Sequence, residues 1–254
     1  EFREFNCQRN HDNRRNRAKV RPVVSCKGTT CQYGLLDSYA ISEEIYKRFY
    51  DGYRDVALPH KFKIAVGGCP NNCVKPSLND FGIYGQRVPQ PNTELCKAVR
   101  NVSLKPPVRS VCRKLLMQGI IDPDKCNRCG RCLHKCPFHV NEDYIAGYSI
   151  VIGGAGQEVA MGQRIPKIFT TEEEVLATLE KTVLFFAEQG QKGERLSDTI
   201  HRIGFEKVDK ELLSDDILSR KDAIVAILEV KSIHFLSEPR KTSFSYDSIR
   251  GSAF

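Results

Sequence analysis

The chain has 254 residues, of which 41% are hydrophobic and 28% charged, a balance that is ordinary for a soluble globular protein of one large or two smaller domains. No run of about 18 apolar residues occurs, so we expect no membrane span, and no secretory leader is visible. The net charge of +8 could indicate a nucleic-acid partner, but half of the excess comes from residues 1–21. Because no zinc-finger or helix-turn-helix pattern accompanies this charge, we expect no nucleic-acid partner.

We expect four regions along the chain. Residues 1–21 form a basic arm that is either solvated and partly disordered or in contact with an anionic cofactor. Residues 22–90 and 141–220 carry the strand and helix signals of one α/β domain. Residues 91–140, rich in cysteine and broken by a Pro-Pro pair, interrupt that domain as an inserted module. Residues 221–254 form a C-terminal tail, and the predicted class is α+β.

Within the α/β segments, hydrophobic periodicity predicts strands at 23–24, 62–66 and 148–152 and helices at 38–53, 172–189 and 197–203. The first helix is expected to bury Ile41, Ile45 and Phe49. The second opens at Thr171, and Glu174 three residues later gives the spacing of a capping box. The first two strands each run into a cysteine motif.

Eight of the eleven cysteines fall into two groups that have the spacing of iron–sulfur sites. The first group is Cys26-x4-Cys31 and, further along the chain, Cys69-x3-Cys73. The second group is Cys126-x2-Cys129-x2-Cys132-x3-Cys136, followed by Pro137. Thiolates at such spacings can wrap one compact cluster, whereas an odd cysteine count without an export signal argues against a disulfide framework. The sequence therefore predicts a redox protein that carries electrons.

The second group is typical of a bacterial-type ferredoxin, in which three cysteines of a run bind one cluster and the fourth often ligates another. A zinc knuckle is the alternative, but zinc sites usually use two separated pairs. The other half of a two-cluster ferredoxin is incomplete, because valines follow Cys96 where two further cysteines would fall. We therefore expect one 4Fe-4S cluster held by Cys126, Cys129 and Cys132, with either Cys112 or Cys136 as the fourth ligand.

The first group carries a resemblance to a known family. Cys26-Lys-Gly-Thr-Thr-Cys31, Lys61-Phe-Lys63 and Cys69-Pro-Asn-Asn-Cys73 resemble the motifs of the siroheme sulfite and nitrite reductases. The inserted ferredoxin-like module makes the pattern similar to the dissimilatory and anaerobic sulfite reductases. The resemblance covers about residues 20–220 and implies a siroheme reductase-like α/β domain with an inserted ferredoxin-like 4Fe-4S module.

The resemblance also implies roles for particular residues. The four cysteines of the first group would hold a 4Fe-4S cluster, and Cys73 would in addition ligate the siroheme iron. Lys61 and Lys63 point to one side of an extended chain and would bind the substrate oxyanion and supply protons. Arg21 would contact a siroheme carboxylate or the substrate.

Two asparagines stand between the last two cysteines of the first group. Asn71, Asn72 and the adjacent backbone amides are expected to donate hydrogen bonds to the cluster sulfurs.

The predicted function is an oxidoreductase that passes electrons through 4Fe-4S clusters to siroheme for the six-electron reduction of sulfite to sulfide, or of nitrite to ammonia. The expected partners are sulfite or nitrite and an electron-donor protein or subunit, in a cytoplasmic protein that could form an oligomer. Residues 1–19 do not resemble the upstream segment with which the family completes its siroheme site. An iron–sulfur electron-transfer subunit or fragment without functional siroheme is therefore the alternative.

Overall fold

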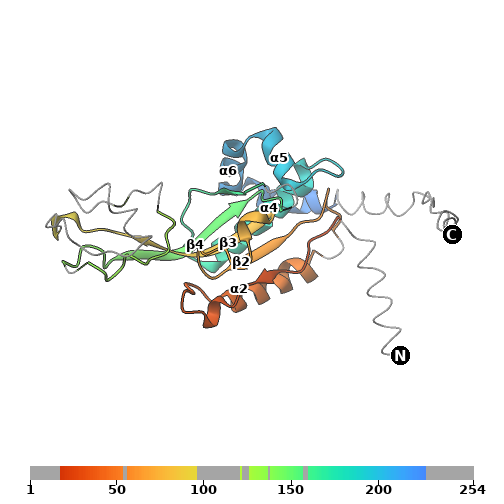
Figure 1. Cartoon of the computed structure of the whole chain (residues 1–254). Coiled ribbons are helices and arrows are strands. Elements are labelled where there is room, and N and C mark those ends of the chain that lie inside the picture. The colour runs from red at the N-terminus through yellow and green to blue at the C-terminus, as the bar shows by residue number, and fades with distance from the viewer. Residues whose placement is uncertain are drawn as a thin grey trace, which may run out of the picture.

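The computed structural model describes residues 18–53, 56–95, 121, 126–136, 138–156 and 160–226. The described residues form an α+β fold around a five-stranded mixed sheet in the order β1-β2-β3-β4-β5 (Figure 1), which confirms the predicted class. The strands are β1 (Val24–Ser25), β2 (Ile64–Gly67), β3 (Phe81–Pro89), β4 (Tyr144–Ile152) and β5 (Gln163–Arg164). The β1–β2 and β2–β3 pairs are parallel, and the β3–β4 and β4–β5 pairs are antiparallel.

The two faces of the sheet carry different side chains. Phe81 pairs with Ile152 and Ile83 pairs with Ile150, so bulky apolar side chains share one face and form the core. The alternate positions hold small or polar residues, among them Ala65, Gly67, Gly82, Tyr84, Gln86 and Ser149. The second face therefore carries few bulky apolar side chains. The loop that follows β2 packs against this face through a 3-10 turn, η3 (Pro76–Leu78).

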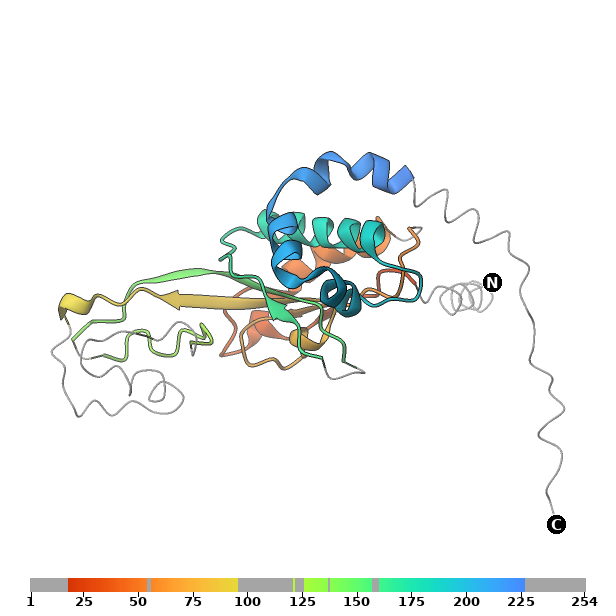
Figure 2. The ribbon, with the colours of Figure 1, turned by 90° about the horizontal axis from the view of Figure 1, so that it is seen from above.

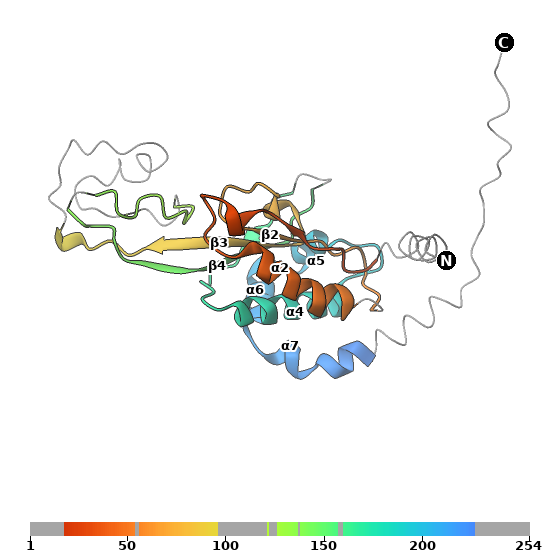
Figure 3. The same cartoon turned by 90° about the horizontal axis from the view of Figure 1, so that it is seen from below.

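Helices α2 (Ser38–Ile45) and α4 (Glu172–Gln189) lie near each other beside the sheet (Figure 3). The α2 helix begins at Asp37, whose carboxylate accepts hydrogen bonds from the first free backbone amides, and continues as a π-helical turn, η2 (Tyr46–Asp51). Ile41, Ile45 and Phe49 are buried as predicted. The helix predicted at 38–53 is thus confirmed, with a changed winding in its second half.

The α4 helix starts with the predicted capping box. The Thr171 hydroxyl accepts a hydrogen bond from Glu174 N at 3.3 Å, and the Glu174 carboxylate accepts one from Thr171 N at 3.4 Å. Three further helices pack on α4: α5 (Leu196–Ile203), α6 (Phe205–Leu213) and α7 (Asp216–Ser219). Among the described residues, no helix has the length and apolar character needed to cross a membrane.

Strands β3 and β4 pair along their whole length, from Phe81 opposite Ile152 to Pro89 opposite Tyr144, as a ribbon that extends beyond the body of the protein (Figure 2). The predicted insert at 91–140 lies between these two strands in the chain. Within this insert, residues 126–136 lie alongside the ribbon, and Cys129 forms a parallel bridge with Arg87. The ribbon therefore carries the second cysteine group.

Candidate functional site

The two halves of the first cysteine group are carried by neighbouring parallel strands. Cys26 directly follows β1, and Cys69 follows the end of β2 by two residues. Parallel strands emerge at the same edge of a sheet, so the two loops leave side by side. Cys26 N donates to Val66 O at 3.0 Å, and Cys26 Sγ accepts a hydrogen bond from Gly68 N, also at 3.0 Å. Sheet pairing therefore fixes the first thiol against the second loop.

A contact between two glycines locks these loops together. A Cβ added to Gly28 would lie 2.7 Å from Gly68 Cα, and one added to Gly68 would lie 2.6 Å from Gly28 Cα. The two backbones cannot easily move apart, because Leu35 N donates to Gly68 O at 2.8 Å and Gly68 N donates to Cys26 Sγ. The close approach of the two motifs thus depends on both glycines.

The four thiols of the first group lie close enough to affect one another. Burial raises the pKa of the Cys69 thiol, and a hydrogen bond from the Asn71 backbone lowers it. The neighbouring groups of Cys73, Cys26 and Cys31 raise that pKa further. All four are free thiols, and Cys73 is exposed while the other three are partly buried. The fold therefore gathers the whole predicted set at one place.

This donor set fits an iron–sulfur cluster. Four sulfur ligands meet beside backbone N–H donors, which is the environment that such clusters use. Among the described residues, no group of three or more His, Cys, Asp or Glu side chains is arranged to hold one metal ion.

The Asn72 side chain, which was expected to donate to the sulfurs, forms its hydrogen bonds elsewhere. Asn72 has a left-handed backbone with φ of 60°. Its Nδ2 donates to Ser77 Oγ at 3.0 Å, and its Oδ1 accepts from the buried Tyr84 hydroxyl at 2.9 Å. The side chain of Asn72 thus holds the loop to Ser77 and Tyr84. The hydrogen bonds to the cysteine sulfurs come from the backbone of Asn71 and Gly68.

The second cysteine group is fixed to β3. Arg87 N donates to Arg128 O at 2.9 Å, and the Arg128 guanidinium donates to Gln86 Oε1 at 3.2 Å. Gly130 takes a left-handed φ of 68°, and a Cβ there would lie 3.0 Å from Arg87 Cβ. The four described cysteines of this group, at 126, 129, 132 and 136, form no disulfide with another described residue and are partly buried. Cys112, the alternative fourth ligand, lies outside the described residues.

Lys61 and Lys63 flank a core residue. Phe62 is fully buried and packs 6.1 Å from the ring of Phe186, so the lysines on either side point to the opposite face. Arg21 runs beside them, because its backbone N donates to Phe62 O at 2.8 Å. The three predicted cationic side chains thus come from two adjacent chain segments.

Burial is the main cause that lowers the pKa of the Lys61 ammonium. The nearby cations Lys63, Arg195 and Arg21 lower it further, while the carboxylate of Asp80 acts in the opposite direction. The repulsion between Lys61 and these neighbouring cations indicates that this region of the protein carries an excess of positive charge, which suits the binding of an anion.

A buried ion pair, which the sequence analysis missed, supports this cationic group. Asp80 is fully buried, and both of its oxygens accept hydrogen bonds from Arg195 Nη2 at 3.0 Å. Asp80 also accepts a hydrogen bond from Lys63 N at 2.9 Å. Arg195 Nε is buried and meets no hydrogen-bond partner among the described residues. The pair therefore ties the N-terminal end of α5 to the chain at Lys63.

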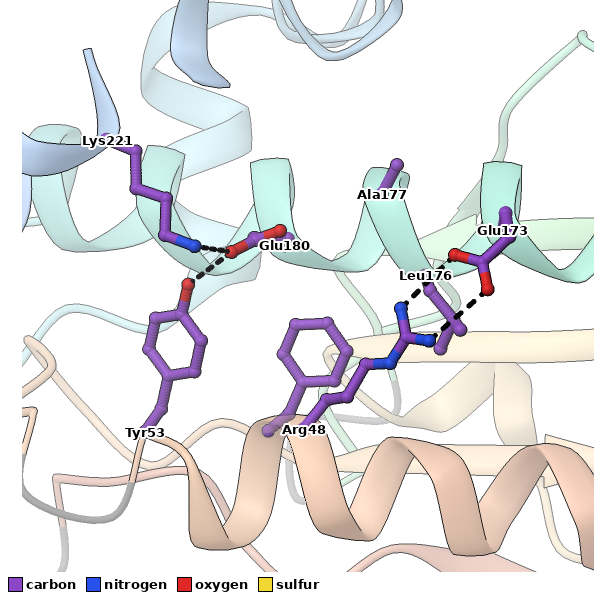
Figure 4. Close-up of a pocket in the computed structure, with 8 residues that line it drawn as sticks. Arg48, Tyr53, Glu173, Leu176, Ala177, Glu180 and Lys221 are labelled. Carbon is purple, nitrogen blue, oxygen red and sulfur yellow. Dashed lines mark hydrogen bonds and ion pairs between the residues drawn. The ribbon is translucent and has the colours of Figure 1, made fainter. Parts of the chain in front are cut away.

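A separate cavity of about 350 Å³ lies between η2 and α4 (Figure 4). Its charged side chains already satisfy one another: Arg48 pairs with Glu173 at 3.2 Å, and Glu180 accepts hydrogen bonds from Tyr53 at 2.7 Å and Lys221 at 2.6 Å. Burial and the Glu180 carboxylate raise the pKa of Tyr53, so its hydroxyl stays protonated. These contacts brace two helices and supply no unpaired group for chemistry.

Comparison with known proteins agrees with the cysteine geometry. The family model "Nitrite and sulphite reductase 4Fe-4S domain" matches residues 6–218. The coenzyme F420-dependent sulfite reductase of Methanocaldococcus jannaschii is 30% identical over 237 residues, which covers 78% of this chain and 32% of the relative. The dissimilatory-type sulfite reductase subunit alpha of Allochromatium vinosum is 29% identical over 210 residues, which covers 73% of this chain and 50% of the relative.

A solved structure shares the fold. The crystal structure of dissimilatory sulfite reductase I superposes with a TM-score of 0.56 at 21% identity, covering 90% of this chain and 57% of that one. The chain therefore spans about half, or less, of the length of the proteins it matches.

Proposed function

Because this chain belongs to the nitrite and sulphite reductase 4Fe-4S domain family, we propose that it is the cluster-binding part of a siroheme-dependent reductase of sulfite or nitrite. The observation that carries the proposal is the convergence of Cys26, Cys31, Cys69 and Cys73 on one site beside the edge of the sheet. A row of cations on a neighbouring part of the chain supports it.

In this proposal the four thiolates of the first group hold one 4Fe-4S cluster. Cys73 is the exposed member and would share its sulfur with the siroheme iron. Cys126, Cys129 and Cys132 would hold a second cluster, with Cys136 or Cys112 as the fourth ligand. When bound, these groups supply the low-potential electrons and the metal that the reduction of an oxyanion requires.

The cationic side chains of this protein would bind the substrate anion and deliver protons to it. Sulfite takes up six electrons and seven protons to give hydrosulfide and three waters, so anion binding and proton delivery are both needed. Lys61, whose pKa is lowered, would give up a proton more readily than an ordinary lysine, and Lys63 and Arg21 would hold negative charge beside it.

The experiment uses protein that is purified without oxygen. Iron, acid-labile sulfide and the visible spectrum are measured together. We expect siroheme bands and an iron count that exceeds sulfide by the siroheme atom. Equal iron and sulfide without those bands would support the alternative, an electron-transfer subunit. Zinc in place of iron would refute both.

Variants separate the roles of the two cysteine groups. Cys69→Ser should lose the cluster of the first group, whereas Cys96→Ser, outside both motifs, should keep all iron. Cys112→Ser and Cys136→Ser decide the fourth ligand of the second cluster, because only one of them should lose iron. Retention of full iron by Cys69→Ser would contradict the ligand assignment.

The lysines are tested with reduced methyl viologen as the electron donor and sulfite or nitrite as the acceptor. Lys61→Ala and Lys63→Ala should each lower turnover by on the order of 10²-fold while siroheme bands persist. Lys47→Ala is the matched control, since Lys47 lies exposed on η2 and pairs only with Glu43 among the described residues. Equal turnover in all three variants would remove the lysines from the proposal.

A further inference from the structure

One side chain of the second cysteine group touches both halves of the first. Arg131 stands between Cys129 and Cys132, and its Nη2 donates to Asn71 Oδ1 at 3.3 Å. Its guanidinium carbon also lies 4.9 Å from the centroid of the Tyr33 ring. Asn71 lies in the Cys69–Cys73 loop, and Tyr33 follows Cys31 by two residues. The two contacts therefore reach two loops that are far apart in the sequence.

The position of Arg131 is set independently by the ribbon. Arg128, three residues earlier, is anchored to β3 through its carbonyl and through its guanidinium. The left-handed Gly130 then packs against the Arg87 side chain and turns the chain back, and Leu133 N closes the turn on Gly130 O at 3.1 Å. The backbone on both sides of Arg131 is therefore held in place by contacts that do not involve the Arg131 side chain.

The two contacts differ in what they require of the side chain. The ring of Tyr33 attracts a flat cation through its π face, and the amide oxygen of Asn71 needs an N–H donor. A guanidinium meets both requirements at once, whereas an ammonium can meet one well. Tyr33 is 47% exposed, so its contact with Arg131 lies at the protein surface.

We infer that Arg131 is a positioning residue that docks the second cysteine motif onto both loops of the first motif within one chain. The inference rests on the proposed function, because docking matters for electron flow only if both motifs hold clusters. If both cysteine groups hold clusters, this contact would set the distance that an electron crosses from the second group to the first, and no bond would be made or broken. A reduced ferredoxin-class protein would supply that electron.

The test compares Arg131→Met, Arg131→Lys and, as a control for the same loss of exposed charge, Arg202→Met on α5. Amide hydrogen exchange of residues 126–136 reports docking, and electron paramagnetic resonance of the dithionite-reduced protein reports the magnetic interaction between the two reduced clusters. For Arg131→Met we expect about tenfold faster exchange, equivalent to ~1.4 kcal/mol, and a weaker interaction at unchanged iron content.

Arg131→Lys should restore part of both signals, and Arg202→Met should match the unaltered protein. Exchange and magnetic interaction that are both unchanged in Arg131→Met would overturn the inference. If the unaltered protein holds no clusters, the proposed function fails, while the exchange measurement still decides whether Arg131 docks the motif.

Discussion

Removing the buried cation at Arg195 should destabilise the protein far more than removing an exposed one. In Arg195→Met, Asp80 keeps its hydrogen bond from Lys63 N but loses both contacts at 3.0 Å, at a site with no exposure to water. A buried charge left without its partner costs about 3–5 kcal/mol. That loss is a large share of the ~5–15 kcal/mol by which such domains are stable.

The assay is urea unfolding with linear extrapolation, and Arg202→Met is the control. Arg202 pairs with Glu194 at 3.0 Å on the surface, so its loss should cost about 0.2–1 kcal/mol. Asp80→Asn combined with Arg195→Met should cost less than the sum of the two single changes, because each single change strands the other partner. Additive losses, or a loss in Arg195→Met no larger than in Arg202→Met, would refute the reasoning.

The same variant has a defined pH dependence. Burial raises the pKa of Asp80, and the charge of Arg195 opposes that rise. Without Arg195 the pKa of Asp80 rises further, so the carboxyl becomes protonated, and its penalty disappears, as the pH falls toward the raised value. The stability difference between Arg195→Met and the unaltered protein should therefore shrink on acidification from about pH 8 to about pH 5. A constant difference would show that Asp80 is not the stranded charge.

Three further changes have defined outcomes. Gly68→Ala should abolish cluster loading with little change in the circular dichroism of the helices, because the new methyl would lie 2.6 Å from Gly28 Cα; full iron content would contradict this. Tyr84→Phe should cost about 1–3 kcal/mol in urea unfolding, since the hydroxyl accepts from Ser77 N at 2.8 Å, and a neutral effect would deny that role. A hydrogen bond from Lys167 lowers the pKa of Glu174 to about 2. Glu174→Gln should therefore cost roughly 0.5 kcal/mol of stability above the ordinary pKa of 4.5, and this cost should shrink as the pH falls through 2. A cost that stays the same over this pH range would exclude the carboxylate as the cause.

The sequence predicted elements whose signals are local. The helix at 172–189 has its cap, its apolar face and its length written in adjacent residues, and it is found with the same bounds. Strand β3 was not predicted, because Gly82, Gly85 and Pro89 disrupt its pattern. Both glycines are needed because other parts of the backbone approach closely: a Cβ on Gly82 would lie 2.4 Å from Pro76 O in the preceding loop, and one on Gly85 would lie 2.5 Å from Gly68 O.

The candidate site likewise combines features that are local in the sequence with contacts that are not. Cysteine spacing and the Lys-Phe-Lys stretch are short-range patterns, so the sequence could nominate them. Asp80 and Arg195 are 115 residues apart, and Arg131 and Asn71 are 60 apart, so no window of sequence contains either pair. The first pair depends on how α5 packs beside β3, and the second on how residues 126–136 lie along the ribbon, so only the assembled fold shows them.

The hydrogen bond between Cys26 and Gly68 joins residues 42 positions apart, across the crossover that contains α2. In an unfolded chain these loops drift apart, so a prosthetic group that needs both can be retained only after the crossover has closed. Its binding free energy then adds to the free energy of folding. Iron limitation would therefore act on this protein twice, by withholding its redox centre and by lowering the temperature at which the polypeptide melts.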